Sequence, residues 1–405
     1  MLCDFLLADH HSTLKSIDAE IGNAVNKDRN GIIPVGTAFA LDGAVMGVWS
    51  SELPRIKIAL SMSNLQTTVI LTALVVGTII SVILRGTLLS RVDYRRIMGT
   101  STLIQVILLT VTVNSNKIFV LFVFTMLLGM FRGFTEVIIN QKSLFLETKV
   151  GKPINSYFHA LYSIFGFAAS ISLSTIGNLY FSEQSSSYIL EACLVLGSAS
   201  LFLIEAQANL DIRHTNEVAH ASTSINRVGS MLAWLGVTAF FAVMAECAVA
   251  DWSGILFLTV HHIDARSAGI GYAAFSGGMA VGRLLGSHVS ATIGDRWCVM
   301  IGSMAASGGL LAGVYGSQII AICGLVLAGL GCANLAPILY RAAHRLSPRI
   351  GVGVVAGFGY SGLVAGPVIV GGITIATGSL PVAFALLCVV YAMVALLSRY
   401  VVPAG

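Results

Sequence analysis

The hydrophobic positions of this 405-residue chain fall into long runs that are separated by short polar turns. A helix needs about 17 to 25 apolar residues to cross the roughly 30 Å hydrocarbon core of a bilayer. The pattern predicts twelve such helices, at 33–51, 65–87, 97–114, 118–140, 157–181, 188–206, 231–259, 269–293, 297–315, 317–340, 352–376 and 381–400. The expected fold class is an all-α membrane protein with twelve transmembrane helices.

Two polar segments suggest how the chain is organised. Residues 1–32 have no basic region before an apolar stretch and no small-residue cleavage site, so we interpret them as a cytoplasmic tail and not as a secretory signal. The longest later polar segment, 207–230, has six predicted helices on each side. We therefore expect a six-helix bundle at 33–206, a cytoplasmic linker at 207–230 and a second six-helix bundle at 231–405.

Composition and charge agree with a membrane protein. Charged residues make up 10% of the chain, against about 25% in a typical soluble domain. If both termini share one side of the membrane, 17 of the 23 Lys and Arg residues fall on that side and four on the other. Because cytoplasmic loops carry the excess of positive charge, we expect both termini to be cytoplasmic. The seven cysteines contain no C-x-x-C pair and are interpreted as packing residues.

The turn after the second predicted helix, RGTLLSRVDYRR at 85–96, resembles a signature of the major facilitator superfamily, approximately G-x-L-x-D-R-x-G-R-R. Ser90 and Asp93 depart from that signature, in place of its acid and its second glycine. The turn after the eighth helix, LGSHVSATIGDRW at 285–297, looks like a weak repeat of it. The resemblance implies a conformational latch, to which we assign Gly86, Arg91, Arg95, Arg96 and, from the eighth helix, Arg283.

Six longer stretches are similar to the fucose permease-like and YbjJ-like branch of bacterial facilitators. They are WSSELP (49–54), GFTEVIIN (133–140), HALYSIFG (159–166), AECAVADWS (245–253), GLGCANLAP (329–337) and GYSGLVAGP (359–367). The resemblance implies the major facilitator fold, two pseudo-symmetric six-helix bundles in a bacterial inner membrane. Parallel repeats of this kind place a solute site at midplane between the bundles, and access alternates as they rock.

Ionisable side chains at bilayer depth are the main functional candidates, because each costs roughly 2.5 to 3.5 kcal/mol on insertion scales. In fucose permeases an acid on the first helix and one on the fourth serve solute contact and protonation, and Asp42 and Glu136 resemble that pair by location. Arg132, Glu136 and Asn140 are spaced i, i+4 and i+8, so they share one helix face. The alternative for Arg132 and Glu136 is an ion pair that only holds the bundle together.

Further candidates each keep two interpretations. Glu246 and Asp251 lie five residues apart, about 140° around a helix, so we expect one to face a central cavity and the other a neighbouring helix or the outer interface. His159 is either a hydrogen-bonded structural group or a proton relay. Asn140 and Asn334 either bind a hydroxylated solute or bridge helices.

Three aromatic residues in the matched stretches are candidates for lining the cavity. Trp49, Trp252 and Tyr360 could stack on a sugar ring. Trp49 and Trp252 could instead anchor the chain at the membrane interface.

These observations predict a secondary active transporter, not an enzyme. A G-x-x-x-x-G-K-[ST] loop is missing, so ATP is not expected to drive transport directly, and we expect neither cofactor nor metal nor nucleic acid. The leading hypothesis is a monomer in the lipid bilayer that moves a small polar, sugar-like solute together with protons, by symport. The alternatives are a proton-coupled exporter of drugs or metabolites, and a receptor or scaffold that does not transport.

Overall fold

The computed structural model describes residues 29–88, 97–151, 154–177, 183–207, 226–348 and 350–402, and within these ranges the chain is helical with no strand. The α-helices are α2 (Arg29–Ala59), α3 (Asn64–Leu88), α4 (Ile97–Val113), α5 (Ile118–Val150), α6 (Asn155–Ile171), α8 (Glu183–Gln207), α9 (Asn226–Thr259), α10 (Ile270–Ile293), α11 (Asp295–Tyr315), α12 (Gln318–Cys332), α13 (Leu335–Leu346), α14 (Gly351–Thr377) and α15 (Leu380–Val401). The π-helical turn η2 (Ser172–Gly177) continues α6, and the 3₁₀ turn η3 (Ser267–Gly269) precedes α10. The all-α prediction is confirmed.

Each of the twelve predicted hydrophobic runs is helical over almost all of its described residues. The fifth combines α6 with η2, and the tenth combines α12 with α13, which are separated by a break at Ala333 and Asn334. Nine helical segments of the described ranges are long and apolar enough to cross a membrane. The helix of the fourth run extends beyond the predicted residue 140 to Val150, where Gly151 in the left-handed conformation ends it. A helix need not end where its hydrophobic run ends, because polar residues can extend it past the bilayer.

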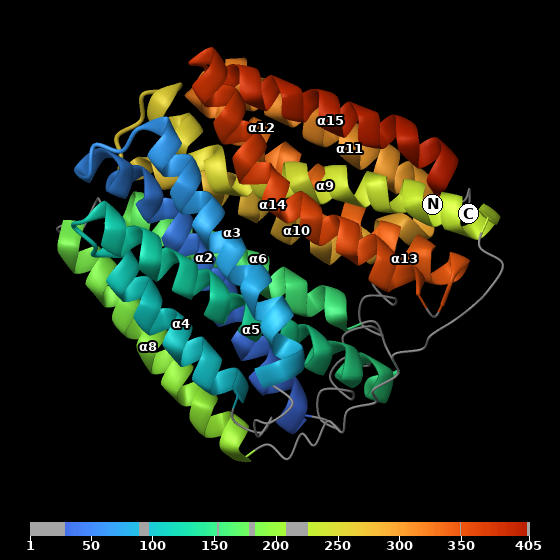
Figure 1. Ribbon diagram of the computed structural model, residues 1–405, viewed down its shortest axis with the longest axis horizontal. Helices are drawn as coiled ribbons and strands as arrows, with labels where there is room; N and C mark the ends of the chain where they lie inside the picture. The colour runs from blue at the N-terminus through green and yellow to red at the C-terminus, as the bar shows by residue number, and fades with distance from the viewer. Residues whose placement is uncertain are drawn as a thin grey trace, which may run out of the picture.

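The helices pair in one pattern that occurs twice. In the first group α2 packs on α6, α3 on α5, α4 on α8 and α4 on α5. In the second group the corresponding pairs are α9 with α14, α10 with α12, α11 with α15 and α11 with α12. The groups meet through α6 and α10, α3 and α14, and α2 and α9, and Figure 1 shows them as blue-to-green and yellow-to-red sets. The chain thus folds as two pseudo-symmetric sets of six spans.

Glycine permits equivalent close crossings in the two sets. A Cβ atom at Gly77 of α3 would lie 2.0 Å from the carbonyl oxygen of Met126 on α5. A Cβ atom at Gly278 of α10 would lie 2.0 Å from the carbonyl oxygen of Val326 on α12. Small residues allow membrane helices to approach this closely. Each crossing positions a helix, α3 or α10, that also contacts the other set.

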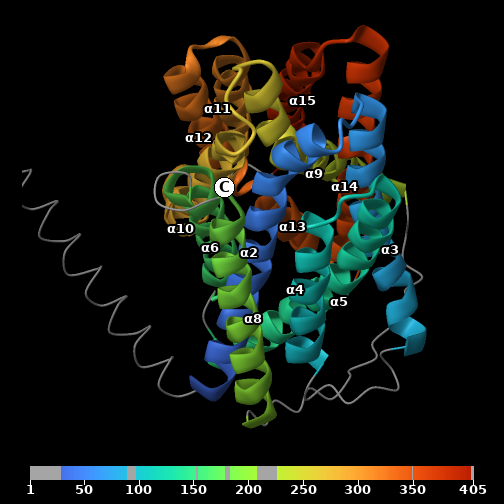
Figure 2. The same cartoon turned by 90° about the vertical axis from the view of Figure 1, so that its left-hand side faces the viewer.

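The two ends of the molecule differ in how the sets meet. At the end where α2 and α6 finish, the hydroxyls of Ser51 and Ser170 are 2.5 Å apart, and Ser170 donates to the carbonyl oxygen of Gly269 at 2.9 Å. At the same end, a Cβ atom at Gly254 would lie 3.0 Å from Pro54. Figure 1 shows the helices of the two sets diverging from there toward the end where α9 begins and α15 finishes, and Figure 2, seen from the left-hand side, shows α11, α12 and α15 above α4, α5 and α8.

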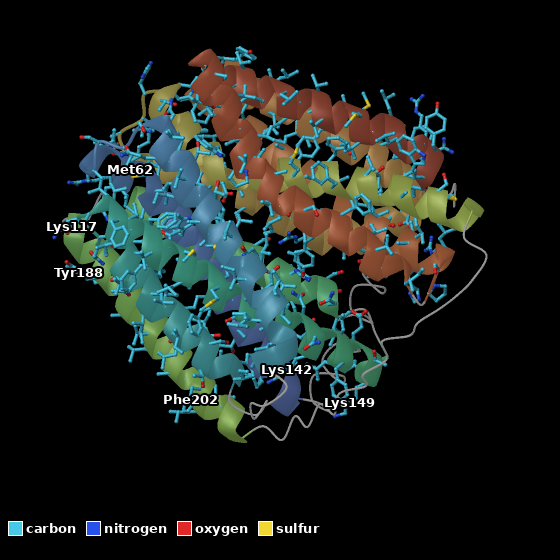
Figure 3. The ribbon with its side chains drawn as sticks, viewed as in Figure 1. Met62, Lys117, Lys142, Lys149, Tyr188 and Phe202 are labelled. Atoms are coloured by element: carbon cyan, nitrogen blue, oxygen red, sulfur yellow. The ribbon has the colours of Figure 1, made fainter. Side chains whose placement is uncertain are left out.

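Labelled lysines mark the two ends. Lys142 and Lys149 lie at the diverging end of the first set and Lys117 at the opposite end (Figure 3). The predicted orientation places the first two in the cytoplasm and the third outside. The predicted tail up to residue 28, the arginines Arg91, Arg95 and Arg96, and linker residues 208–225 lie outside the described residues.

Candidate functional site

Asp42, in the middle of α2, is almost completely buried, with 1% of its surface exposed. Its Oδ1 accepts a hydrogen bond of 2.7 Å from Nε2 of Gln105, a fully buried residue on α4. The other oxygen of each side chain, Oδ2 of Asp42 and Oε1 of Gln105, has no hydrogen-bond partner among the described residues. Sequence analysis missed Gln105, although an amide inside an apolar run was a signal that could have found it.

Arg132 of α5 lies between two carboxyl groups that come from different helices. Its Nη1 is 3.3 Å from Oε2 of Glu136, one turn along the same helix, and its Nε is 3.8 Å from Oδ1 of Asp42. Nη2 donates to the hydroxyl of Tyr162 on α6 at 3.5 Å. The Glu136 side chain is 27% exposed and that of Asp42 is 1% exposed. One guanidinium therefore serves two acids, of which only Glu136 is partly exposed in this conformation.

Arg283 of α10 forms a second network that joins the two sets of helices. Its Nη2 is 3.3 Å from Oε1 of Glu246 on α9. Its Nη1 donates to Oγ of Ser163 at 2.5 Å and to the backbone carbonyl of His159 at 3.2 Å, both on α6. The His159 ring meets the ring of Phe39 edge to face, with centroids 5.1 Å apart. His159 thus contributes its backbone to the network, while its imidazole packs against an aromatic side chain.

The two networks face a common region near α9. The Cys247 thiol is within electrostatic range of Glu246 and Asp251 on its own helix, and also of Arg132 and Glu136 on α5. The positive charge of Arg132 likewise acts on Asp251. Charges from both sets of helices therefore act on this part of α9.

Asn140 and Asn334 both bond to backbone in this conformation. Asn140 Nδ2 donates to the carbonyl oxygen of Glu136 on its own helix at 2.8 Å. Asn334, at the break before α13, donates to the carbonyl oxygen of Gly282 on α10 at 2.7 Å. A Cβ atom at Gly286 would lie 2.0 Å from Oδ1 of Asn334, so the glycine is needed for this approach. Asn334 bridges two helices here, and a solute contact by either asparagine stays a prediction.

The aromatic candidates separate by exposure. Trp49 and Trp252 are fully buried, and their indole N–H groups have no partner among the described residues. The alternative that they anchor the chain at the membrane interface is wrong, because an anchor must reach the headgroups. Tyr360 is exposed on α14. Stacking on a solute stays a prediction for all three.

The proposed latch is described only in part. Gly86 lies near the end of α3, and its arginine partners fall outside the described residues. The turn after α10 holds a charge cluster: Asp295 is 2.9 Å from Nη2 of Arg341 and 3.1 Å from Nη1 of Arg345, and it accepts a hydrogen bond from Ser290. From the sequence these two arginines could be counted only as cytoplasmic charges, because the pattern does not show that α13 packs beside the start of α11.

The sequence is similar to those of bacterial membrane proteins over most of its length. An uncharacterized MFS-type transporter of Yersinia pestis is 25% identical over 368 residues, which cover 90% of this chain and 94% of that protein. Membrane protein MosC of Rhizobium meliloti is 25% identical over 351 residues, which cover 86% of this chain and 84% of that protein. No protein-family model matches the chain.

Solved structures of the major facilitator fold superpose on most of this chain. The nucleoside transporter NupG has a TM-score of 0.64 at 13% identity, covering 92% of this chain and 99% of NupG. The fucose:proton symporter FucP of E. coli has a TM-score of 0.58 at 15% identity, covering 92% of this chain and 98% of FucP. The chain thus has the fold of major facilitator transporters, and its sequence is similar to those of bacterial membrane proteins, one of which is an MFS-type transporter.

Proposed function

We propose that the chain is a secondary transporter that couples the movement of a small polar solute to protons, by symport. Asp42 and Glu136 are the coupling acids, and Arg132 is the cation that they share. The observation that carries this proposal is the position of the Arg132 guanidinium, 3.3 Å from one carboxyl group and 3.8 Å from the other.

The charge balance of this network favours proton exchange. One guanidinium neutralises one carboxylate, so a second ionised acid beside it leaves a negative charge far from water, which is costly at bilayer depth. A proton on either acid removes that charge and leaves Arg132 to the other. Glu136 is open enough to exchange a proton with water in this conformation, whereas Asp42 must first be uncovered.

We propose that the solute is a sugar or a nucleoside. The hydroxyl of Tyr162 already bonds to Arg132, and the carboxyl groups and Asn140 nearby offer further hydrogen-bond partners for solute hydroxyls. Of the two structural neighbours, one transports nucleosides and the other fucose with protons. Both classes of solute carry several hydroxyl groups on a ring, which is the chemistry that such a network can bind.

We propose that this conformation is open toward the cytoplasm. The contacts among Ser51, Ser170 and Gly269 close the opposite end, and the helices diverge toward the end that we expect to be cytoplasmic. Transport then requires these contacts to separate while the diverging ends come together.

The test is uptake by proteoliposomes in which an imposed pH gradient drives accumulation from a library of labelled sugars and nucleosides. Glu136→Gln is expected to abolish proton-driven accumulation and to keep counterflow exchange, because the neutral amide imitates a permanently protonated acid. Glu147→Gln is the matched control on the same helix, since Glu147 bonds to the backbone of Asn155 and lies away from Arg132. Normal accumulation by Glu136→Gln would remove this residue from the coupling mechanism.

A further inference from the structure

Asp42 and Gln105 form a hydrogen-bonded pair, in which three of the four polar side-chain atoms can only accept hydrogen bonds if Asp42 is ionised. Nε2 of Gln105 donates to Oδ1 of Asp42 at 2.7 Å. The remaining two oxygens, Oδ2 of Asp42 and Oε1 of Gln105, are buried and without a partner among the described residues. An amide oxygen and a carboxylate oxygen can only accept hydrogen bonds, so they cannot satisfy each other if Asp42 is ionised.

A proton on Asp42 gives both unpartnered oxygens, Oδ2 of Asp42 and Oε1 of Gln105, a hydrogen bond. A buried polar atom without a partner costs about 1 to 3 kcal/mol, and a protonated carboxyl group offers one O–H donor beside its accepting oxygen. We propose that Asp42 carries a proton on Oδ2 in this conformation and donates it to Oε1 of Gln105. The two side chains then form a ring closed by two hydrogen bonds, in which every polar atom has a partner and no charge is buried.

The charged surroundings of Asp42 fit this assignment. The titratable side chains that interact with Asp42 are Arg132 and Glu136 on α5 and Tyr162 on α6, and α4 supplies the neutral Gln105. The Nε–H of Arg132 has no acceptor, although it lies 3.8 Å from Oδ1 of Asp42. An ionised Asp42 so close to a free N–H donor would be expected to accept from it, whereas a neutral one leaves Arg132 to Glu136.

This pairing deepens the proposed function and rests on Asp42 being a coupling acid. When the Oδ2–H bond breaks and the proton passes to water, Asp42 becomes a carboxylate that can accept from the free Nε–H of Arg132. Gln105 can keep its bond to Oδ1 throughout. Gln105 is thus a positioning residue: it holds the neutral form of Asp42 away from Arg132 and so leaves the guanidinium to Glu136 until the proton is released.

Infrared spectroscopy of the full-length protein in lipid nanodiscs tests the pairing, because a protonated carboxyl group has its own carbonyl band. At neutral pH the wild-type protein is expected to show such a band, and Asp42→Asn is expected to remove it. Gln105→Met is expected to shift the band to higher frequency, since the Asp42 carbonyl loses its hydrogen bond. The same substitution in Gln318, at the start of α12 in the second set, serves as the control: Gln318→Met is expected to leave the band unchanged.

Two results would overturn the proposal. If Asp42→Asn removes no protonated-carboxyl band, Asp42 is ionised, and if Gln105→Met leaves the frequency unchanged, the ring does not exist. Should Gln105→Met fail to fold, Gln105→Asn replaces it, because its amide is one methylene too short to close the ring. Uptake separates this inference from the proposed function: proton-driven accumulation by Asp42→Asn would remove Asp42 from coupling, whatever the spectra show about its proton.

Discussion

The Arg132 network and the Arg283 network are both built from a guanidinium, at least one carboxyl group and a hydroxyl, but they lie differently with respect to the two sets of helices. Arg132 shares its charge between Asp42 and Glu136, and its ion pairs and its hydrogen bond to Tyr162 go to α2, α5 and α6 of the first set. Arg283 pairs with one acid, Glu246, and its remaining bonds cross from α10 to α6. The first network is therefore contained in one set of helices, while the second spans the boundary between the two sets.

This difference assigns separate tasks to the two arginines. A network inside one set can stay intact while the sets rock, so its charges can change partner without any helix separating. A network across the boundary must change when α6 and α10 move apart, so it favours the conformation in which it is complete. We therefore expect changes at Arg132 to affect coupling and changes at Arg283 to affect the balance between conformations.

The largest effect is expected from Arg132→Met, which leaves the buried Asp42 and the partly exposed Glu136 without their cation. Removing one partner of a buried ion pair costs about 3 to 5 kcal/mol, and a loss of about 3 kcal/mol corresponds to roughly a hundredfold. Proton-driven accumulation is expected to fall by about that factor, together with a lower thermal unfolding temperature of the purified protein. Arg132→Lys keeps the charge but not the fork of donors that reaches both acids. Its proton-driven accumulation should lie between that of the wild type and that of Arg132→Met. Full activity of Arg132→Met would show that the acids do not depend on it.

A smaller and different effect is expected from Arg283→Gln. The substitution removes the ion pair with Glu246 and weakens the hydrogen bonding to Ser163 of α6 across the boundary. The closed end should therefore open more often. A cysteine in place of Ser51, in a protein whose seven native cysteines are replaced by serine, should then react several-fold faster with a membrane-impermeant maleimide. Accumulation should slow but stay driven by protons.

The labelling experiment has an internal reference and a clear contrary outcome. Ser61→Cys, in the exposed turn after α2, should react equally in both backgrounds. If Arg283→Gln leaves the Ser51→Cys rate unchanged and abolishes coupling as completely as Arg132→Met, the division of tasks between the two arginines is wrong.

Gly269→Ala should open the same end without altering any charge. A Cβ atom at Gly269 would lie 2.7 Å from Cβ of Ser51, closer than such atoms approach. Overpacking of this kind costs about 1 to 3 kcal/mol. Here it destabilises only the conformation in which this end is closed. The expected result is faster maleimide labelling of a cysteine at Ser170 with coupling retained. Gly308→Ala, where a Cβ atom meets nothing within 4 Å, is the matched control.

The sequence predicted the helices and the charged members of the site, but not how they connect. Hydrophobic run length is a local property, so the spans could be recognised, and Asp42 and Arg132 stood out because ionisable groups are rare at that depth. Gln105 and Ser163 did not stand out, because neutral polar residues are common in membrane helices and bond to many partners. Which of them meets an acid or an arginine depends on the packing of α4 on α2 and of α6 on α10, which no single helix encodes.

The smallest effect is expected from Asn334→Ala, which separates the two interpretations of this residue. Its bond to Gly282 joins α13 to α10 inside the second set, and a hydrogen bond between membrane helices contributes about 0.6 kcal/mol on average and up to about 1.7. If bridging is its role, unfolding of the purified protein should shift by that amount while the solute concentration for half-maximal counterflow stays the same. Asn140→Ala is the comparison, because its bond lies within one helix and its loss should change stability even less. A rise in the half-maximal concentration for Asn334→Ala, with stability unchanged, would instead place its amide on the solute, and the second set would then take part in binding as well as in closing the molecule.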